Sequence, residues 1–172
     1  MRLLLAFAAL IVLCIGCYET KYSLGPRDGG TVNLAYVGDF TSGEGDGRTV
    51  IAIRNVDNKS YYVQWTEVEK ADKRDKPVRF VGFTADVKGA IFAHLRPLTD
   101  DGTIAEKHLV ARVSLSDDNN VLTIRNLHED FFKDKSIDSD QAFRRVVEQN
   151  LEDASMYDDA DGIKAVRVPA EK

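Results

Sequence analysis

Residues 108–127 read HLVARVSLSDDNNVLTIRNL, two alternating apolar stretches on either side of an acidic turn. Successive side chains of a β-strand point to opposite faces, so Leu109 and Val113 share one face while His108 and Arg112 share the other. Asp and Asn between the two stretches are typical turn residues. The pattern predicts an antiparallel hairpin with one face in a core and the other exposed to water.

Outward from this hairpin, short apolar runs alternate with Gly- and Asp-rich connectors from residue 31 onward. Such spacing is typical of many short strands joined by hairpins. We therefore predict a mainly β fold, an antiparallel meander of 7–8 strands in one domain over residues 31–172. A sheet of this size normally curls or closes, because open edges invite aggregation, and a barrel is the form we expect. The expected strands cover residues 31–37, 49–55, 61–68, 78–87, 90–98, 108–115, 121–127 and 163–168.

Helical signals occur between the last two expected strands. Glu129 precedes Phe131 and Lys133, a charge order that suits a short helix. Further on, apolar residues recur at helical spacing between residues 142 and 151, after Asp138 and Ser139, either of which can cap a helix. We predict a short helix and then a longer C-terminal helix that packs on the sheet before the last strand.

The N-terminus carries a separate signal. After Arg2, thirteen residues from Leu3 to Ile15 contain no charged side chain. A membrane-spanning helix needs about 20 residues, whereas the apolar region of a signal peptide needs about 7 to 15. We therefore expect residues 1–16 to be an export signal that is removed.

The end of this run, Leu13-Cys14-Ile15-Gly16-Cys17, resembles the lipobox of bacterial lipoproteins, although Cys14 stands where that family prefers Leu. The resemblance implies cleavage after Gly16 and lipidation of Cys17, which would attach the chain to a membrane. Two alternatives remain open at this point: an ordinary secretory signal cut elsewhere, and an anchor helix that is not cleaved. Residues 17–30 lack periodicity and contain turn formers, so we predict a linker there.

The order of the expected elements, a meander followed by a helix and a final strand, resembles the lipocalin-like barrels. The chain lacks the Gly-x-Trp of that family, since Gly30-Thr31-Val32 stands at the first expected strand and the single tryptophan is Trp65. Residues 108–127 and the following helix also resemble a group of uncharacterised bacterial lipoproteins. Both resemblances imply a fold and a compartment, and neither implies an activity.

One strand face gathers groups that could bind an anion. His94 and Arg96 share a face, as do His108 and Arg112, and Arg125 follows on the neighbouring expected strand. If this face lines a barrel interior, the five groups would make an anion pocket. If it faces water, it is an ordinary sheet surface, which is the interpretation we favour.

No spacing in the sequence points to catalysis. His94, His108 and His128 show no ligand spacing to one another, and no metal site or cofactor is expected. The tail around Asp159 and Asp161 fails the calcium-loop pattern, because Tyr157 and Val168 stand where carboxylates are required. No G-x-S-x-G occurs. We name no catalytic residue and favour a protein that is not an enzyme.

The composition limits the partners. With 23 Lys and Arg against 28 Asp and Glu, the net charge of −5 argues against a nucleic-acid partner. We expect a lipoprotein anchored to the cell membrane or outer membrane through Cys17, with its domain outside the cytoplasm. Its activity would be binding of a small ligand or an envelope protein, or a scaffold role. The alternative is an envelope hydrolase that uses dispersed His and carboxylate residues.

Overall fold

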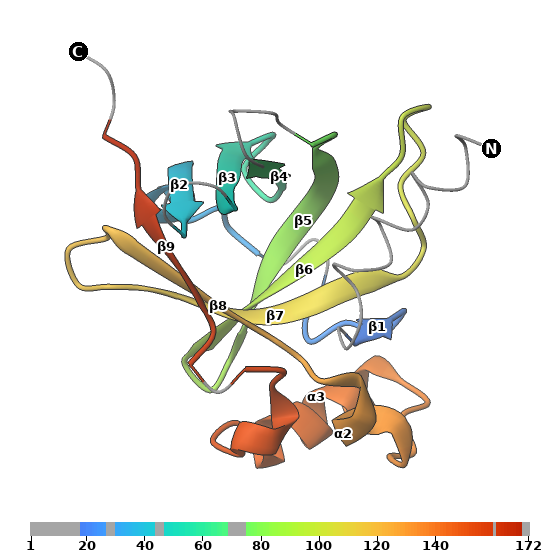
Figure 1. Cartoon of the computed structure of the whole chain (residues 1–172). Coiled ribbons are helices and arrows are strands. Elements are labelled where there is room, and N and C mark those ends of the chain that lie inside the picture. Colours follow the sequence, from blue (N-terminus) through green and yellow to red (C-terminus); the bar gives the residue numbers. More distant parts are fainter. Residues whose placement is uncertain (1–17, 27–29, 44–46, 69–74, 160, 170–172) are drawn as a thin grey trace.

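The computed structural model describes residues 18–26, 30–43, 47–68, 75–159 and 161–169. In this part of the chain, antiparallel strands form a closed eight-stranded barrel, and two α-helices lie together on one side of it (Figure 1). The predicted mainly β fold, with a short helix and a longer helix before the last strand, is confirmed.

Most elements coincide closely with the expected ranges. The two α-helices are α2 (Glu129–Lys133) and α3 (Asp140–Gln149), and the side chain of Ser139 caps α3 by accepting a hydrogen bond from the Ala142 amide at 3.2 Å. Two 3-10 helices, η1 (Leu34–Tyr36) and η3 (Ala154–Met156), complete the helical elements described. The strands are β1 (Glu19–Thr20), β2 (Gly38–Ser42), β3 (Arg48–Asn55), β4 (Tyr61–Val68), β5 (Val78–Val87), β6 (Ala90–Leu98), β7 (His108–Leu115), β8 (Val121–Asn126) and β9 (Ile163–Arg167).

The barrel closes through pairings between distant parts of the chain. Each strand from β2 to β8 pairs with the next one along the chain, and β9 pairs with both β2 and β8, which closes the barrel. Strand β7 pairs with β8 from Ala111 to Leu115 and with β1 at His108 and Leu109. The two-residue strand β1 therefore continues the seam of the barrel where β8 leaves it.

The first expected strand, over residues 31–37, is not a strand. Residues 34–36 form η1, and the pairing begins only at Gly38. The apolar side chains of this segment, Val32 and Val37 among them, pack across one end of the barrel and not along its wall. Apolar content alone therefore misplaced this strand by several residues.

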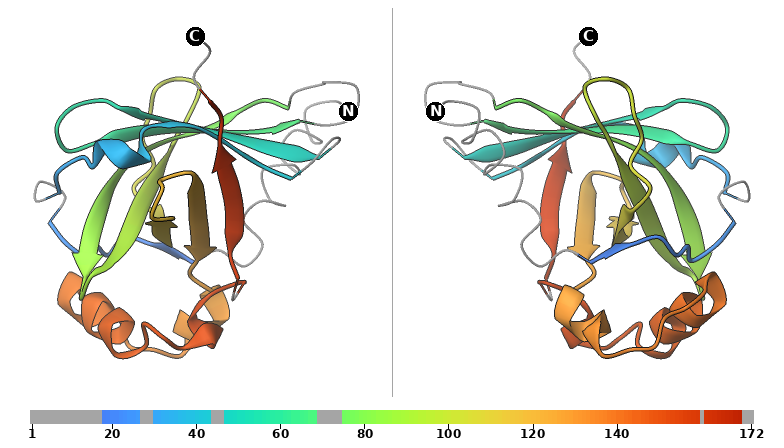
Figure 2. Two further views of the ribbon diagram at one scale, coloured as in Figure 1. Left: turned by 90° about the vertical axis from the view of Figure 1, so that its left-hand side faces the viewer. Right: turned by 90° about the vertical axis from the view of Figure 1, so that its right-hand side faces the viewer.

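Both helices cover the outside of the barrel. Buried side chains of α3, Phe143 and Val147, pack with Phe92 of β6 and Val110 of β7, which point away from the barrel interior. We call this the outer core. Figure 2 shows the helices below the strands in two opposite views, with the N-terminal segment crossing between them and the barrel.

The N-terminal segment is part of this outer core. Leu24 has no exposed surface, and Thr20 and Ser23 are each 4% exposed. The Ser23 amide donates to Asp140 of α3 at 2.9 Å, and Arg144 donates to the Leu24 carbonyl. A linker was expected over residues 17–30, but the described part of this segment packs against the domain. Its apolar side chains have no regular period, and they pack against the outer face of β6 and β7.

Residues 1–17 lie outside the described part of the chain. The predicted signal peptide over residues 1–16 and the lipidation site Cys17 belong to this stretch. Among the helices that are described, none combines the length and hydropathy that a membrane crossing requires.

Candidate functional site

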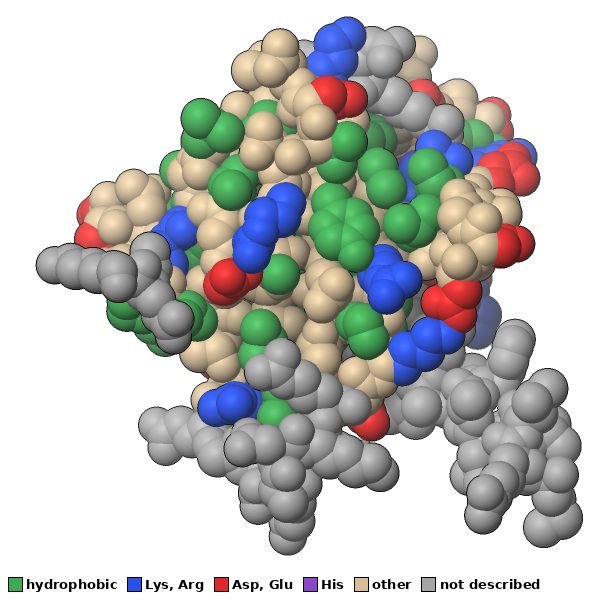
Figure 3. Space-filling model, turned by 90° about the horizontal axis from the view of Figure 1, so that it is seen from above, with side chains coloured by type: hydrophobic (Ala, Val, Ile, Leu, Met, Phe, Trp, Pro, Cys, Tyr) green, Lys and Arg blue, Asp and Glu red, His purple; other side chains and the backbone are tan. Residues whose placement is uncertain are grey.

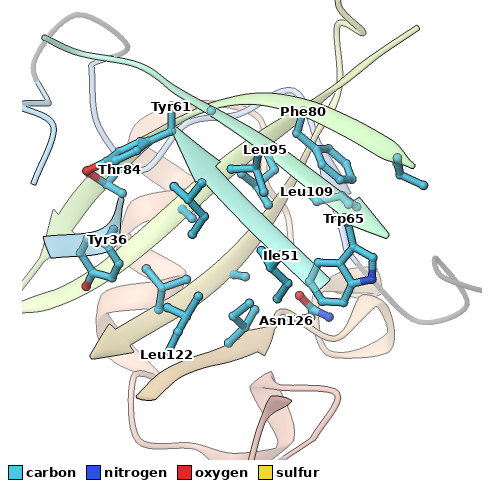
Figure 4. Close-up of a pocket in the computed structure, with 18 of the residues that line it drawn as sticks. Tyr36, Ile51, Tyr61, Trp65, Phe80, Thr84, Leu95, Leu109, Leu122 and Asn126 are labelled. Atoms are coloured by element: carbon cyan, nitrogen blue, oxygen red, sulfur yellow. The ribbon is translucent and has the colours of Figure 1, made fainter. Parts of the chain in front are cut away.

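The interior of the barrel contains a cavity of about 480 Å³. Its wall is made by the inward-facing side chains of seven barrel strands and is almost entirely apolar. Figure 4 shows these side chains pointing into the space between the strands. Lining residues include Ile51, Val63, Phe80, Leu95, Leu109, Val113, Leu122 and Ile124.

Small residues on three neighbouring strands keep this space open. Ala93 of β6 lies directly opposite Ala111 of β7, and both line the cavity. On β5, Gly82 also lines it, and a Cβ there would come within 2.6 Å of the His94 carbonyl oxygen. Larger residues at positions 93 and 111 would fill the interior, as side chains do in many eight-stranded barrels, whereas any side chain at position 82 would collide with the backbone of β6.

One end of the barrel is covered by the segment that contains η1. Tyr36 and Val37 pack against the interior core. The Asn33 amide donates to the Tyr61 hydroxyl at 2.6 Å, and Arg167 donates to the Val37 carbonyl at 2.8 Å. The segment is therefore tied to both β4 and β9.

The tyrosines at this end are shielded from water. Burial raises the pKa of Tyr61 above its ordinary value, and burial followed by the nearby Tyr61 does the same for the pKa of Tyr36. Both phenols line the cavity and stay neutral at physiological pH. In Figure 4 they lie with Thr84 at the end opposite Trp65 and Asn126.

The other end of the cavity is reached from outside, and we call it the mouth. Among the side chains that line the mouth, that of Glu19 is exposed and the others are partly exposed. The Trp65 Nε1 atom is buried there and has no hydrogen-bond partner among the described residues. The mouth is formed by Glu19 of β1, Trp65 of β4, Val78 of β5, Pro97 of β6, Leu109 of β7 and Asn126 of β8.

The two histidines that were candidate ligand residues lie outside the barrel. His94 and His108 are fully buried, and their ring centroids are 4.8 Å apart. His94 Nε2 accepts from the Leu24 amide at 3.4 Å, and His108 Nε2 lies 3.0 Å from the Tyr22 carbonyl oxygen. Both rings therefore hold the N-terminal segment against the sheet.

The three arginines of the same face also make structural contacts. Arg96 donates to the Ala105 carbonyl at 2.8 Å. Arg112 donates to the Leu151 carbonyl at 3.1 Å, and the Arg125 guanidinium lies 3.8 Å from the Tyr157 ring centroid. None of the five candidate residues is among the described residues that line the cavity.

The alternation predicted from residues 108–127 is correct, but each face has a different environment from the one expected. The Leu109 face borders an open cavity where a filled core was expected. On the other face, His108 and Val110 are buried against the N-terminal segment and α3 where water was expected, and Ser114 at the far end of the strand is exposed. A period of two separates the faces of a strand but does not indicate what covers them.

Sequence reasoning missed the residues that shape the cavity. Ala93, Ala111 and Gly82 carry no chemical signal, and their role depends on the register, which pairs Ala93 with Ala111 and Gly82 with Leu95. Trp65 enters the sequence analysis only as the single tryptophan of the chain. In the described part of the chain, no three His, Cys, Asp or Glu side chains are close enough to hold a metal ion.

The comparisons with known proteins add no relative. No protein-family model matches the chain, and no curated protein and no solved structure is significantly similar to it. The geometry of the barrel therefore carries the functional argument.

Proposed function

We propose that this protein is an exported, lipid-anchored binding protein that holds a small amphiphile in its barrel. The carrying observation is the apolar cavity of about 480 Å³ inside a closed barrel. Ligand pockets typically have volumes of about 300 to 1,000 Å³ and apolar walls with few polar groups. An eight-stranded barrel that is not filled by its own side chains has room for one small ligand.

The polar groups of the cavity favour a ligand that is apolar along its length and polar at one end. A buried N–H without a partner costs about 1 to 3 kcal/mol, so an acceptor atom beside Trp65 Nε1 would be stabilised. Asn126 at the same mouth can donate or accept a hydrogen bond. Deeper in the cavity, the wall offers mainly dispersion contacts and burial of apolar surface.

The anchor in this proposal rests on the sequence of residues 1–17. The short apolar leader and the Gly16-Cys17 junction support export followed by lipidation, with the domain outside the cytoplasm on the cell membrane or outer membrane. Two acyl chains hold a protein on a bilayer far more firmly than one.

A hydrolase receives less support than a binding protein. No histidine belongs to the described cavity lining, and His94 and His108 are buried against Leu24 and Tyr22. A scaffold protein does not need an open interior, whereas a protein that binds a ligand inside its barrel does. The cavity therefore favours binding over a scaffold role.

We expect the chain from Tyr18 onward, which contains every described strand and helix, to bind one molecule of oleate. This shortened chain lacks Cys17 and therefore carries no acyl group, so it can be studied without detergent. Because Trp65 is the single tryptophan and lines the mouth, 9,10-dibromostearate should quench its fluorescence in a saturable way, and oleate should reverse the quenching. Half-saturation at about 1 µM or below corresponds to about −8 kcal/mol or better. Absence of saturable quenching would contradict ligand binding.

The anchor has its own test. Expressed as the full chain in bacteria, the protein should have an intact mass equal to residues 17–172 plus at least a diacylglyceryl group. The Cys17→Ala chain should carry no acyl group and keep its leader. A wild-type product of full length, or one cut elsewhere and not acylated, would contradict the lipidation of Cys17.

A further inference from the structure

We infer that the mouth of the cavity faces the bilayer to which Cys17 is attached, so that the ligand enters from the membrane itself. The inference rests on the proposed lipid anchor. It concerns an interaction surface, the rim formed by Glu19, Trp65, Pro97 and Asn126, and its partner is a lipid bilayer. Three observations on the described residues lead to it.

The first observation is that almost no chain separates the anchor from the barrel. Cys17 is bonded directly to Tyr18, and consecutive Cα atoms are about 3.8 Å apart. The Tyr18 amide donates to the Leu127 carbonyl at 2.9 Å, and its ring stacks on Phe132 with centroids 4.4 Å apart. The first residue after the anchor is therefore fixed to the domain.

The second observation is that this point of attachment is beside the mouth. Glu19 follows Tyr18, pairs with Leu109 of β7, and lines the cavity together with Leu109. Asn126, on the other side, precedes the Leu127 carbonyl that holds Tyr18. An acylated Cys17 would thus place its lipid within two residues of the cavity opening.

The third observation is that the opposite end of the barrel is covered. The η1 segment lies across it, tied by Tyr61 and Arg167. On the side of the molecule seen from above in Figure 3, hydrophobic side chains lie among polar and charged ones. The mouth therefore combines the point of attachment, the opening, and a rim in which Trp65 and Pro97 lie beside the polar Glu19 and Asn126.

The geometry gives two ends that can be compared. Ile104 is 38% exposed and bridges to Leu98 at the mouth end of β6, whereas Val56 is 60% exposed and follows Asn55 at the covered end of β3. Strand β6 has nine residues, and with a tilt of about 40° it separates the two ends by about 20 Å. A domain held with its mouth on the bilayer would place the two positions at different depths.

The test uses the acylated protein in phosphatidylcholine vesicles that contain a spin-labelled lipid. Ile104→Cys and Val56→Cys each provide one reactive thiol, because Cys14 leaves with the signal peptide and Cys17 is acylated. With an environment-sensitive fluorophore on each, we expect at least twofold quenching at position 104 and little change at position 56. Equal quenching at both positions, or stronger quenching at position 56, would overturn the inference.

A matched variant separates orientation from mere attachment. Insertion of about ten Gly and Ser residues between Cys17 and Tyr18 keeps the anchor but adds a reach of about 17 Å. Quenching at position 104 should then fall to the level seen at position 56. If the insertion leaves the difference unchanged, the short tether does not set the orientation.

Failure of the inference can be distinguished from failure of the proposed function. A chain that is not acylated would not float with the vesicles, which would remove the anchor. A chain that floats but does not bind dibromostearate in solution lacks the ligand site. A chain that floats, binds the fatty acid and shows no difference between the two probes overturns the membrane-facing mouth alone.

Discussion

Replacing Ala93 with phenylalanine is expected to abolish ligand binding while leaving the barrel folded. The new ring would extend from β6 into the cavity directly opposite Ala111. Because the space is open and apolar, the ring can occupy it without displacing a packed neighbour. We expect the affinity for oleate to fall by about tenfold or more, about 1.4 kcal/mol at least. Titration of the Trp65 quenching measures it.

Stability gives the second readout for this variant. Filling an apolar cavity commonly stabilises a protein by about 0.5 to 2 kcal/mol, so the midpoint of thermal unfolding should stay the same or rise. Ser114→Phe, on the exposed side of β7, adds a ring of the same kind outside the barrel and should bind oleate normally. Unchanged binding by Ala93→Phe would place the ligand outside the cavity.

Phe143→Ala is expected to cause the largest loss of stability. Phe143 has no exposed surface, and its ring lies 5.6 Å from Tyr18 and 5.8 Å from Phe132, centroid to centroid. Truncation of a buried Phe costs about 3 to 5 kcal/mol, because burial is lost and a cavity remains. The midpoint of thermal unfolding should fall by roughly 10 °C. Gln141→Ala, on the exposed side of α3, is the control.

The same variant should loosen the N-terminal segment. Amide exchange at Leu24, which hydrogen-bonds to His94, should accelerate more than exchange in the middle of β4. If exchange accelerates uniformly, the outer core and the barrel unfold as one unit. Loss of stability below about 1 kcal/mol would contradict the role assigned to the outer core.

The wall of the barrel was predictable because local signals agree with the final structure. The strands at residues 78–87 and 90–98 have the expected bounds, since the turn at Lys88 and Gly89, both at positive φ, separates two regular alternating runs. The start of α3 was predictable for the same reason, and of the two candidate caps, Asp138 and Ser139, the structure uses Ser139.

The segments at the two ends of the barrel were not predictable in this way. Residues 31–37 look like a strand by composition, but their side chains cover the end of a barrel whose shape depends on all the other strands. Residues 18–24 show no period, and only the uncovered face of β6 and β7 gives them a place to pack. Tertiary contacts override local preference at both segments.

The cavity could not be predicted because it depends on register. Ala93, Ala111 and Gly82 are unremarkable along the chain, and they become neighbours only when β5, β6 and β7 align. His94 and His108, two of the five residues grouped on one strand face, lie with their ring centroids 4.8 Å apart. The burial of these two histidines depends on the N-terminal segment and α3, which come from distant parts of the chain.

The last seam of the barrel has a consequence for synthesis of the chain. Phe40 of β2 pairs with Arg167 of β9, so the edge of β2 stays unpaired until a strand that is synthesised much later is available. Contacts between such distant residues are slow to form, and unpaired edges in the meantime can join those of other molecules. Synthesis that stops before residue 163 would release a chain without β9, in which the edges of β2 and β8 are unpaired. Such a chain is expected to aggregate.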